Sequence, residues 1–409
     1  MKFDGRLRYA VLGALSLLFF ILNASTFNAL GVILPYMVAD LGWSWAVAGA
    51  GFTLLGIACG LSGLMPAILI RRFGVSRTML LGGFVLLLGF ACLGLTHGAA
   101  LYFAGTILLG IGFCICGQVP AVNVISHSFT KRSTAMGVYF TAGGLGSVAG
   151  PLIAYATQEF TDQWRYYWAG AAIASVLLSV FAASVTAARW NNRDAGDLPH
   201  ELSAQPGWRV RDAIRTPQYY IIVGVYTSFL LTNTTVHGFA VQHLADTGIG
   251  MASAATVMSM IALISAGGSA LAGLVGEKLK PRPLTLVSLA ANVIGGLALA
   301  VGGTHFAAIA VATIGLGIGF GFSYVSVAML LLDVFGRRPN LELYSTMSLI
   351  STTAAIGPAL GGFVRDHMGS FSYVFAACAL IGLLFSLALL TMKQPEPAEE
   401  HTGAAPAAA

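Results

Sequence analysis

The side chains that could do chemistry in this chain are one histidine and a set of amides, hydroxyls and phenols inside long apolar runs. His237 is the only ionisable side chain well inside such a run, and no Asp or Glu lies in the middle of one. An imidazole changes charge between pH 5 and 8, so His237 could bind an anion or carry a proton. The runs hold no paired acids, no His-Glu-x-x-His helix and no suitably spaced Ser/His pair. The sequence therefore predicts binding and proton transfer, with no enzymatic activity and no cofactor.

Polar side chains recur at helical spacing within these runs. Asn23 and Thr26 are three residues apart, and Tyr226, Asn233 and His237 are separated by seven and four. Inside a bilayer such groups face a cavity or a neighbouring helix, because an unpartnered polar group is costly in hydrocarbon. The predicted substrate-binding residues are Asn23, Thr26, Gln118, Tyr139, Tyr226, Asn233, His237, Tyr324, Ser348 and Thr352.

Each of these residues also has a structural interpretation. Ser and Thr in membrane helices usually bond to carbonyls of their own helix. Tyrosines near the ends of spans, such as Tyr344, are typical anchors at the membrane interface. His237 could be a packing histidine with satisfied hydrogen bonds or could lie at the outer rim. Primary amides such as Asn23, Gln118 and Asn233 are the stronger candidates, since they cost more to bury without a partner.

The five cysteines, which all fall inside apolar runs, indicate packing and no metal site. Cys114 and Cys116 are two residues apart, which on a helix points their side chains in nearly opposite directions. Cys59, Cys92 and Cys378 have no His, Asp or Glu beside them to complete a ligand set. We therefore expect all five to be small packing residues.

The composition indicates that these residues are positioned by membrane-spanning helices. The chain of 409 residues is 57% hydrophobic and 9% charged, with a mean hydropathy of +0.81, whereas soluble proteins are about a quarter charged. The net charge of +5 is typical of membrane-facing loops and not of a nucleic-acid partner. Twelve apolar runs are long enough to cross a bilayer. They are Tyr9 to Leu34, Trp45 to Ile70, Ser76 to Thr96, Ala99 to Ser126, Ser133 to Gln158, Trp164 to Ala188, Gln218 to Leu244, Met251 to Gly276, Pro283 to Val301, Thr304 to Leu332, Leu341 to Arg365 and Ser370 to Met392.

The basic residues predict the orientation of these spans. If the N-terminus is cytoplasmic and the spans alternate, 19 of the 21 Lys and Arg residues lie on the cytoplasmic side. Only Arg165 and Arg365 lie outside, each beside acidic residues. The charges thus predict an even number of spans, with both termini cytoplasmic, in the plasma membrane, which in a bacterium is the inner membrane.

The spans divide into two halves that repeat each other. Residues 1–188 form a predicted N-terminal six-helix bundle, 189–217 a cytoplasmic linker, 218–392 a C-terminal six-helix bundle and 393–409 a disordered cytoplasmic tail. The sequence Gly110-Ile-Gly-Phe recurs as Gly317-Ile-Gly-Phe, and Gly150-Pro recurs as Gly357-Pro, both 207 residues further on. Such an offset indicates a duplicated unit, parallel in the membrane because six is even.

With these motifs the chain resembles the major facilitator superfamily, and within it the monocarboxylate transporter and oxalate/formate antiporter branch. The resemblance is carried by Leu30-Gly-Val-Ile-Leu-Pro35 with Asp40-Leu-Gly-Trp-Ser44, by Phe129 to Gly137, by Gly146-Ser-Val-Ala-Gly-Pro151 and by Gly357-Pro-Ala-Leu-Gly-Gly362. It covers about Arg8 to Thr391. It implies an all-α membrane protein of twelve transmembrane helices in two pseudo-symmetric six-helix bundles. It also implies alternating access, with spans one, four, seven and ten lining the site, and a monomer surrounded by lipid.

Two departures from the family bear on gating and on the substrate. Arg71 stands where the loop between spans two and three usually carries an acid, while the second copy of that loop keeps Glu277. Ser269 aligns with the arginine that holds the substrate carboxylate in the monocarboxylate branch. The predicted gating residues are Arg71, Arg77, Glu277, Asp333 and Arg337. Asp333 and Arg337, four residues apart, form either a cytoplasmic gate pair or a weak interfacial ion pair.

The leading hypothesis is a secondary active transporter that carries a small organic anion, a monocarboxylate, with a proton as candidate co-substrate. The alternative is an exporter or facilitator of a neutral or largely apolar small molecule, which the nearly uncharged spans favour. A polytopic membrane enzyme lacks a catalytic set in the sequence. A non-transporting sensor would carry a large soluble domain, and the Ala-Pro-rich segment after Lys393 is too short for one.

Overall fold

The computed structural model describes residues 5–129, 132–187, 208–276, 279–336 and 339–393. These residues are almost entirely helical, and they contain no β-strand. The helices are α1 (Gly5–Ser25), α2 (Phe27–Leu41), α3 (Trp45–Leu61), η1 (Ser62–Leu64), α4 (Met65–Phe73), α5 (Val75–Gly94), α6 (Ala99–Cys116), α7 (Gln118–Ser128), α8 (Arg132–Thr161), α9 (Trp164–Ala187), α10 (Val210–Ala213), α11 (Pro217–Asp246), α12 (Met251–Gly276), α13 (Pro281–Val301), α14 (Phe306–Phe335), α15 (Asn340–Ser351), η4 (Thr352–Ile356), α16 (Gly357–Met368) and α17 (Ser372–Thr391).

Within the described residues, eleven helical segments are long and apolar enough to cross a bilayer. They correspond to eleven of the twelve predicted spans. The remaining one, Gln218 to Leu244, lies within α11, a continuous helix of 30 residues that packs on α12, α14 and α17. Its Thr, Asn, Gln and His residues lower its mean hydropathy. α11 is therefore long enough to cross a bilayer but more polar than the other eleven spans.

Several predicted spans are interrupted in the structure. Span one changes direction between α1 and α2, where the Ser25 and Thr26 hydroxyls each donate to a carbonyl one turn earlier at 2.6 Å. Such bonds bend membrane helices. Span four breaks at Gly117, and span eleven passes through η4 before α16 restarts with Pro358 in its first turn. Pro358 therefore lies just after an interruption of the helix, whereas α8 runs through Pro151 as one helix.

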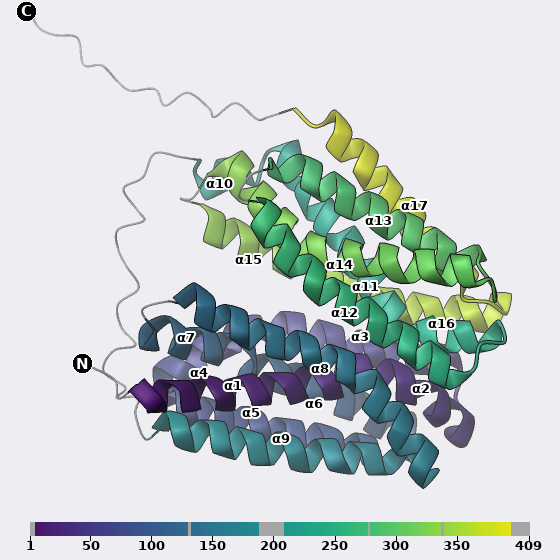
Figure 1. The fold of residues 1–409 in the computed structure, drawn as a ribbon, viewed down its shortest axis with the longest axis horizontal. Helices are drawn as coiled ribbons and strands as arrows, with labels where there is room; N and C mark the ends of the chain where they lie inside the picture. Colours follow the sequence, from purple (N-terminus) through teal and green to yellow (C-terminus); the bar gives the residue numbers. More distant parts are fainter. Residues whose placement is uncertain (1–4, 130–131, 188–207, 277–278, 337–338, 394–409) are drawn as a thin grey trace, which may run out of the picture.

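The helices gather into two bundles, which Figure 1 colours from purple to teal and from green to yellow. In the first bundle α5 packs on α6 and α9, and α1 packs on α8; in the second, α14 packs on α12 and α13. The repeated glycines allow close helix contacts in both bundles. Gly110 of α6 lies against the carbonyl of Leu55 in α3, and Gly317 of α14 lies against Ile264 in α12. A side chain at either glycine would separate its helix pair.

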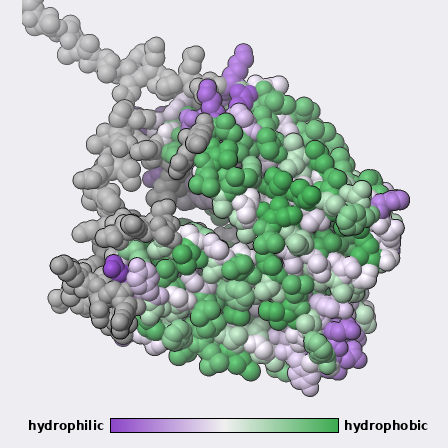
Figure 2. Space-filling model, viewed as in Figure 1, coloured by the Kyte–Doolittle hydropathy of each residue, from purple (hydrophilic) through white to green (hydrophobic). Residues whose placement is uncertain are grey.

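The bundles touch at one end of the molecule and diverge toward the other. Contacts between them join α3 to α16, α8 to α12 and α2 to α11. We call the end with Leu41, Trp45, Asp246 and Met368 the closed end. We call the opposite end, with the start of α1 and with α7, α10 and α15, the linker end (Figure 1). Figure 2 shows hydrophobic surface along the sides of the bundles and hydrophilic residues at their ends, as a bilayer requires, and a hollow between the bundles toward the linker end.

Candidate substrate site

A row of aromatic rings lies between α11 and α14 of the second bundle, and two of its members, Phe229 and Phe320, are almost fully buried. The ring of Phe229 in α11 meets Tyr324 of α14 edge-on, with centroids 4.7 Å apart. Phe229 also lies 6.1 Å from Phe320, whose ring stacks at 5.9 Å on the imidazole of His237. We call His237, Phe320, Phe229 and Tyr324 the aromatic wall. Tyr324 keeps 45% of its surface exposed although it lies well inside α14, so a ligand between the bundles can reach its ring and hydroxyl.

Three tyrosines, Tyr226, Tyr324 and Tyr344, gather where the aromatic wall faces the linker end. The ring of Tyr226 in α11 lies 6.2 Å from that of Tyr344 in α15 and 5.9 Å from that of Phe229, which also meets Tyr324. We call these residues the tyrosine cluster. Phenol hydroxyls both donate and accept hydrogen bonds, so the cluster can hold a carboxylate or a neutral polar group.

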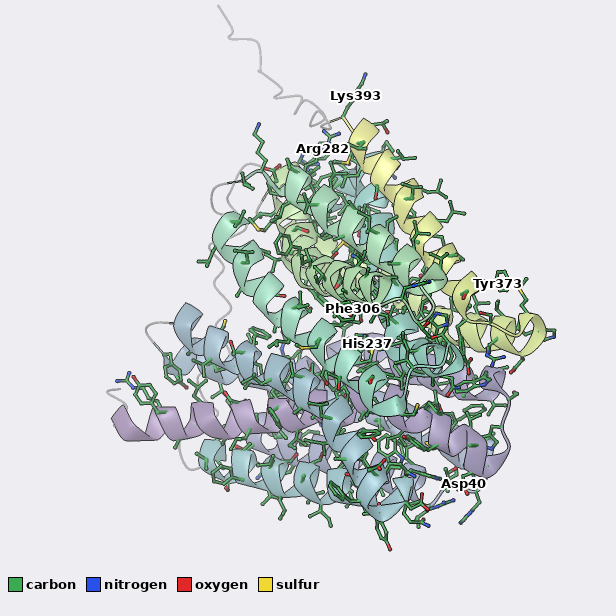
Figure 3. All side chains as sticks on the ribbon, turned by 45° about the vertical axis from the view of Figure 1, so that its right-hand side comes forward. Asp40, His237, Arg282, Phe306, Tyr373 and Lys393 are labelled. Atoms are coloured by element: carbon green, nitrogen blue, oxygen red, sulfur yellow. The ribbon has the colours of Figure 1, made fainter. Side chains whose placement is uncertain are left out.

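His237 lies in the interior of the molecule, near the junction of the two bundles (Figure 3). Its Nδ1 is 2.8 Å from the carbonyl oxygen of Asn233. Because a carbonyl only accepts, Nδ1 carries the proton of this bond, and Nε2 is left to accept or to donate. The main-chain carbonyl of His237 faces Gly31 of α2 across the bundle interface. His237 therefore combines a ring nitrogen free of the Asn233 bond with a backbone contact to the first bundle.

The facing side of the first bundle is built on α1 and α8. Phe19 stacks on Tyr139 at 4.4 Å, and Tyr139 is almost fully buried. Asn23 is half-buried, and its amide donates to the carbonyl of Phe19 at 2.8 Å. Thr26 is fully buried with its hydroxyl bonded to Leu22, so it has no surface for a ligand in this conformation. Of these predicted residues, Asn23 is the accessible one.

Two cysteines face the tyrosine cluster from the first bundle. Cys59 of α3 is a close neighbour of Cys114 of α6 and lies within electrostatic range of the Tyr324 hydroxyl. Both cysteines are half-buried. From the sequence these two cysteines were expected only to be packing residues.

The predicted site residues therefore fall into groups and do not form a single pocket. Tyr226 and His237 are 11 residues apart on α11, which is about 16 Å of helix, so a small acid cannot touch both at once. Ser348 and Thr352 lie one turn apart, the Thr352 hydroxyl donating to the Ser348 carbonyl at 3.2 Å. Thr352 packs on Gly60 of α3. Gln118 begins α7, and its side chain lies outside the described residues.

The three predicted gating residues that the structure describes form no ion pair with another described residue. Arg71, Arg77 and Asp333 are exposed, and Glu277 and Arg337 lie outside the described residues. The two ion pairs among the described residues are at the closed end and within bundles: Arg165 with Asp40 at 2.9 Å, and Arg365 with Asp246 at 3.0 Å.

Ser269, the position aligned with the family's arginine, is half-buried at the seam between α12 and α14. Its hydroxyl donates to the carbonyl of Gly321 at 2.9 Å. No Lys, Arg, Asp or Glu belongs to the aromatic wall or the tyrosine cluster. The residues assigned to the candidate site are thus polar and aromatic, and none of these described side chains is Lys, Arg, Asp or Glu.

Sequence reasoning did not assign Tyr344 and Cys59 to this site. Tyr344 was expected at the membrane interface because it lies near a span end, but α15 turns it toward Tyr226. A signal was present, since Tyr344 and Ser348 are four residues apart and share a helix face. For Cys59 no pattern in the sequence indicates that it faces Tyr324.

The comparisons with known proteins agree with this architecture. The Major Facilitator Superfamily profile matches residues 15–353, and the chain belongs to that family of membrane transporters. It is 26% identical over 370 residues to the uncharacterized transporter YycB of Bacillus subtilis (strain 168), covering 87% of each chain. It is also 26% identical to the human monocarboxylate transporter 11, covering 82% of this chain and 80% of that one.

The fold is also that of a solved transporter. The crystal structure of the nucleoside transporter NupG superposes with a TM-score of 0.72, at 16% identity, over 95% of this chain and all of that chain. The all-α multi-pass fold and the resemblance to monocarboxylate transporters are thereby confirmed. These relatives are transporters and not enzymes.

Proposed function

We propose that this protein is a secondary active transporter that carries a monocarboxylate by alternating access of two six-helix bundles. The observation that carries the proposal is the exposed phenol of Tyr324, whose ring packs on Phe229 at 4.7 Å, with Tyr226 and Tyr344, 6.2 Å apart, in the same cluster. Hydroxyl donors can bind a carboxylate without a cationic side chain, since each donates one hydrogen bond to an oxygen. The similarity to proteins named monocarboxylate transporters supports this substrate class.

A proton is the proposed co-substrate. A site with no fixed charge binds an anion poorly in a low-dielectric environment, because the anion loses its hydration without gaining a counter-charge. A proton that crosses with the acid makes the translocated species neutral. His237 offers Nε2 as a place to hold that proton, since Nδ1 is bonded to the Asn233 carbonyl. The protein would then be a proton-coupled symporter.

We further propose that a monomer lies in the inner membrane with both termini cytoplasmic and with lipid around both bundles. The exposed basic residues Arg71, Arg72, Arg77 and Lys280 are at the linker end, which fits a cytoplasmic face. The conformation described here is then inward-facing. Arg71, Arg77, Glu277, Asp333 and Arg337 remain proposed gating residues, which would meet when the linker end closes.

The test is uptake by the purified protein in proteoliposomes with imposed pH gradients. Lactate, pyruvate and aromatic acids are compared with their amides, which have the same shape but no carboxylate. We expect saturable uptake of acids that is accelerated by an inward proton gradient. Absence of saturable uptake for every acid would refute the proposal.

A second candidate is the transport of a neutral or largely apolar compound. The observation that favours it is the aromatic wall, which contains no Lys, Arg, Asp or Glu. Ser269, which stands at the position of the family's arginine, adds a hydroxyl and no charge. In the same proteoliposomes this candidate predicts uptake of amides or other neutral analogues that ignores pH and membrane potential.

A further inference from the structure

A carboxylate of the second bundle caps a helix of the first bundle at the closed end. Asp366, near the end of α16, accepts hydrogen bonds from the backbone N–H groups of Trp45 at 3.0 Å and Ala46 at 2.7 Å. These are the first two residues of α3. The third N–H, that of Val47, is bonded to the Ser44 hydroxyl of the same chain segment at 3.3 Å. The first turn of α3 is therefore satisfied partly from across the bundle interface.

The surroundings hold Asp366 at this position. Its neighbour Arg365 forms the ion pair with Asp246 at the end of α11, which ties the end of α16 to its own bundle. The guanidinium of Arg365 also lies over the ring of Phe371 at 5.6 Å. The carboxylate is thus presented to α3 by an anchored helix end.

The capped residue Trp45 also inserts its side chain into the second bundle. Its indole meets Phe371 edge-on at 5.3 Å and Phe239 at 6.0 Å, and these two rings stack on each other at 4.6 Å. The backbones approach closely as well, because Gly362 of α16 lies directly against the Trp45 carbonyl. Backbone, carboxylate and aromatic contacts therefore coincide at one junction.

The junction related by the internal repeat lacks this cap. The 207-residue offset pairs Asp366 with Glu159 of α8, and the 206-residue offset of Asp40 and Asp246 pairs Trp45 with Met251 at the start of α12. In the described residues Glu159 accepts from the Tyr155 hydroxyl of its own helix at 3.0 Å. No hydrogen bond of Glu159 reaches α12 within that described part of the chain. The α3–α16 junction therefore has a helix cap between the bundles, and no matching cap by Glu159 is seen at the described α8–α12 junction.

We propose that Asp366 is the latch of the closed end: it stabilises the closed arrangement by capping α3, and its release accompanies opening at this end. The inference rests on the alternating access proposed above. A carboxylate that accepts from the first N–H groups of a helix gains from both the hydrogen bonds and the helix dipole. When the bundles separate, water replaces these bonds on an exposed surface, so the latch biases the equilibrium without locking it.

The experiment measures distances between spin labels at both ends of the full-length protein by pulsed electron paramagnetic resonance. The five native cysteines are replaced by alanine. Labelled cysteines replace the exposed residues Gln163 and Met368 at the closed end, or Arg72 and Lys280 at the linker end. We expect Asp366→Ala to raise the ratio of open to closed conformers at the closed end about tenfold, which corresponds to the loss of about one helix cap. The linker-end distances should shorten in parallel.

Two variants test the specificity of this effect. Glu159→Ala removes the related carboxylate and should leave both distance distributions unchanged. Asp366→Glu keeps a carboxylate and should restore most of the closed population. Unchanged distributions in Asp366→Ala, or an equal shift in Glu159→Ala, would overturn the latch. Because the distances need no substrate, a shift in Asp366→Ala without uptake of any acid would support the latch while refuting the proposed substrate class.

Discussion

Gly31 of α2 lies against the main-chain carbonyl of His237 in α11, so two helices from different bundles touch backbone to backbone. A Cβ at Gly31 would overlap the carbonyl oxygen and come within 3.0 Å of its carbon. Backbone atoms cannot move aside as a flexible side chain can. We therefore expect Gly31→Ala to disfavour the closed end by about 1 to 3 kcal/mol, the usual cost of overpacking, and to slow transport strongly. Spin-label distances at the closed end and uptake rates measure both effects.

Gly13→Ala is the matched control for this substitution. Gly13 is in α1, on the same span, and a Cβ there meets nothing within 4 Å. Alanine is the better helix former, so Gly13→Ala should leave transport intact and stabilise the helix slightly. If both variants transport like the wild type, the backbone contact at Gly31 has no role in closing the molecule.

The Tyr324 hydroxyl is expected to bind the substrate carboxylate. Tyr324→Phe keeps the ring that meets Phe229 at 4.7 Å and removes only the hydroxyl. The loss of one hydrogen bond to a charged group costs about 1.5 to 3 kcal/mol, so KM for acids should rise about tenfold or more. Uptake kinetics measure this change, and a neutral analogue serves as the control. An equal loss for acids and neutral analogues would mean that the hydroxyl does not recognise the carboxylate.

His237 is expected to make uptake depend on pH. In His237→Gln the side chain keeps a polar amide near Asn233 but cannot gain a proton between pH 5 and 8. We expect this variant to lose the stimulation of acid uptake by an inward proton gradient while retaining exchange of bound substrate. The measurement is initial uptake at pH 6 and pH 8. An unchanged pH profile would assign the proton to the substrate alone.

The span pattern could be predicted from composition because a helix in lipid must be apolar on most of its surface. The repeat of Gly110 as Gly317 also corresponds to a structural equivalence, because each glycine lies in the contact between equivalent helices of its bundle. The interruption after Ile356 fits Pro358, which lies in the first turn of α16. The spans, the repeated glycines and the interruption near Pro358 depend on residues close together in the chain, so a single sequence is enough to predict them.

The contacts between bundles could not be predicted in the same way. Asp366 and Trp45 are 321 residues apart, and nothing near either residue indicates the other. The sequence suggested Asp333 and Arg337 for gating because they are four residues apart, whereas the described contacts between the bundles include the Asp366 cap, at the opposite end. Likewise the stripe of Tyr226, Asn233 and His237 on α11 was predicted as one surface, but its length separates the tyrosine cluster from the imidazole.

The buried amide of Asn292 in α13 is expected to lower the stability of the second bundle. Its side chain is nearly fully buried; Nδ2 donates to the Ser323 hydroxyl at 3.3 Å, and Oδ1 has no partner among the described residues. It lines a narrow gap in the packing together with Thr232 and Cys378. A buried acceptor without a partner costs about 1 to 3 kcal/mol, more than one long hydrogen bond returns. We expect Asn292→Leu to stabilise the protein by about 1 kcal/mol, measured by thermal unfolding in detergent.

The matched variant Asn292→Ala removes the same polar atoms but leaves their volume empty. It should destabilise the protein, because a cavity next to Thr232 forfeits packing contacts. Ser323 keeps its bond to Ser288 at 3.2 Å in both variants, so the comparison isolates the filling of the site. A lower melting temperature for Asn292→Leu than for the wild type would contradict this prediction. It would show that Oδ1 has a hydrogen-bond partner in the membrane, for example a buried water, and that the bundle interior holds more water than its packing indicates.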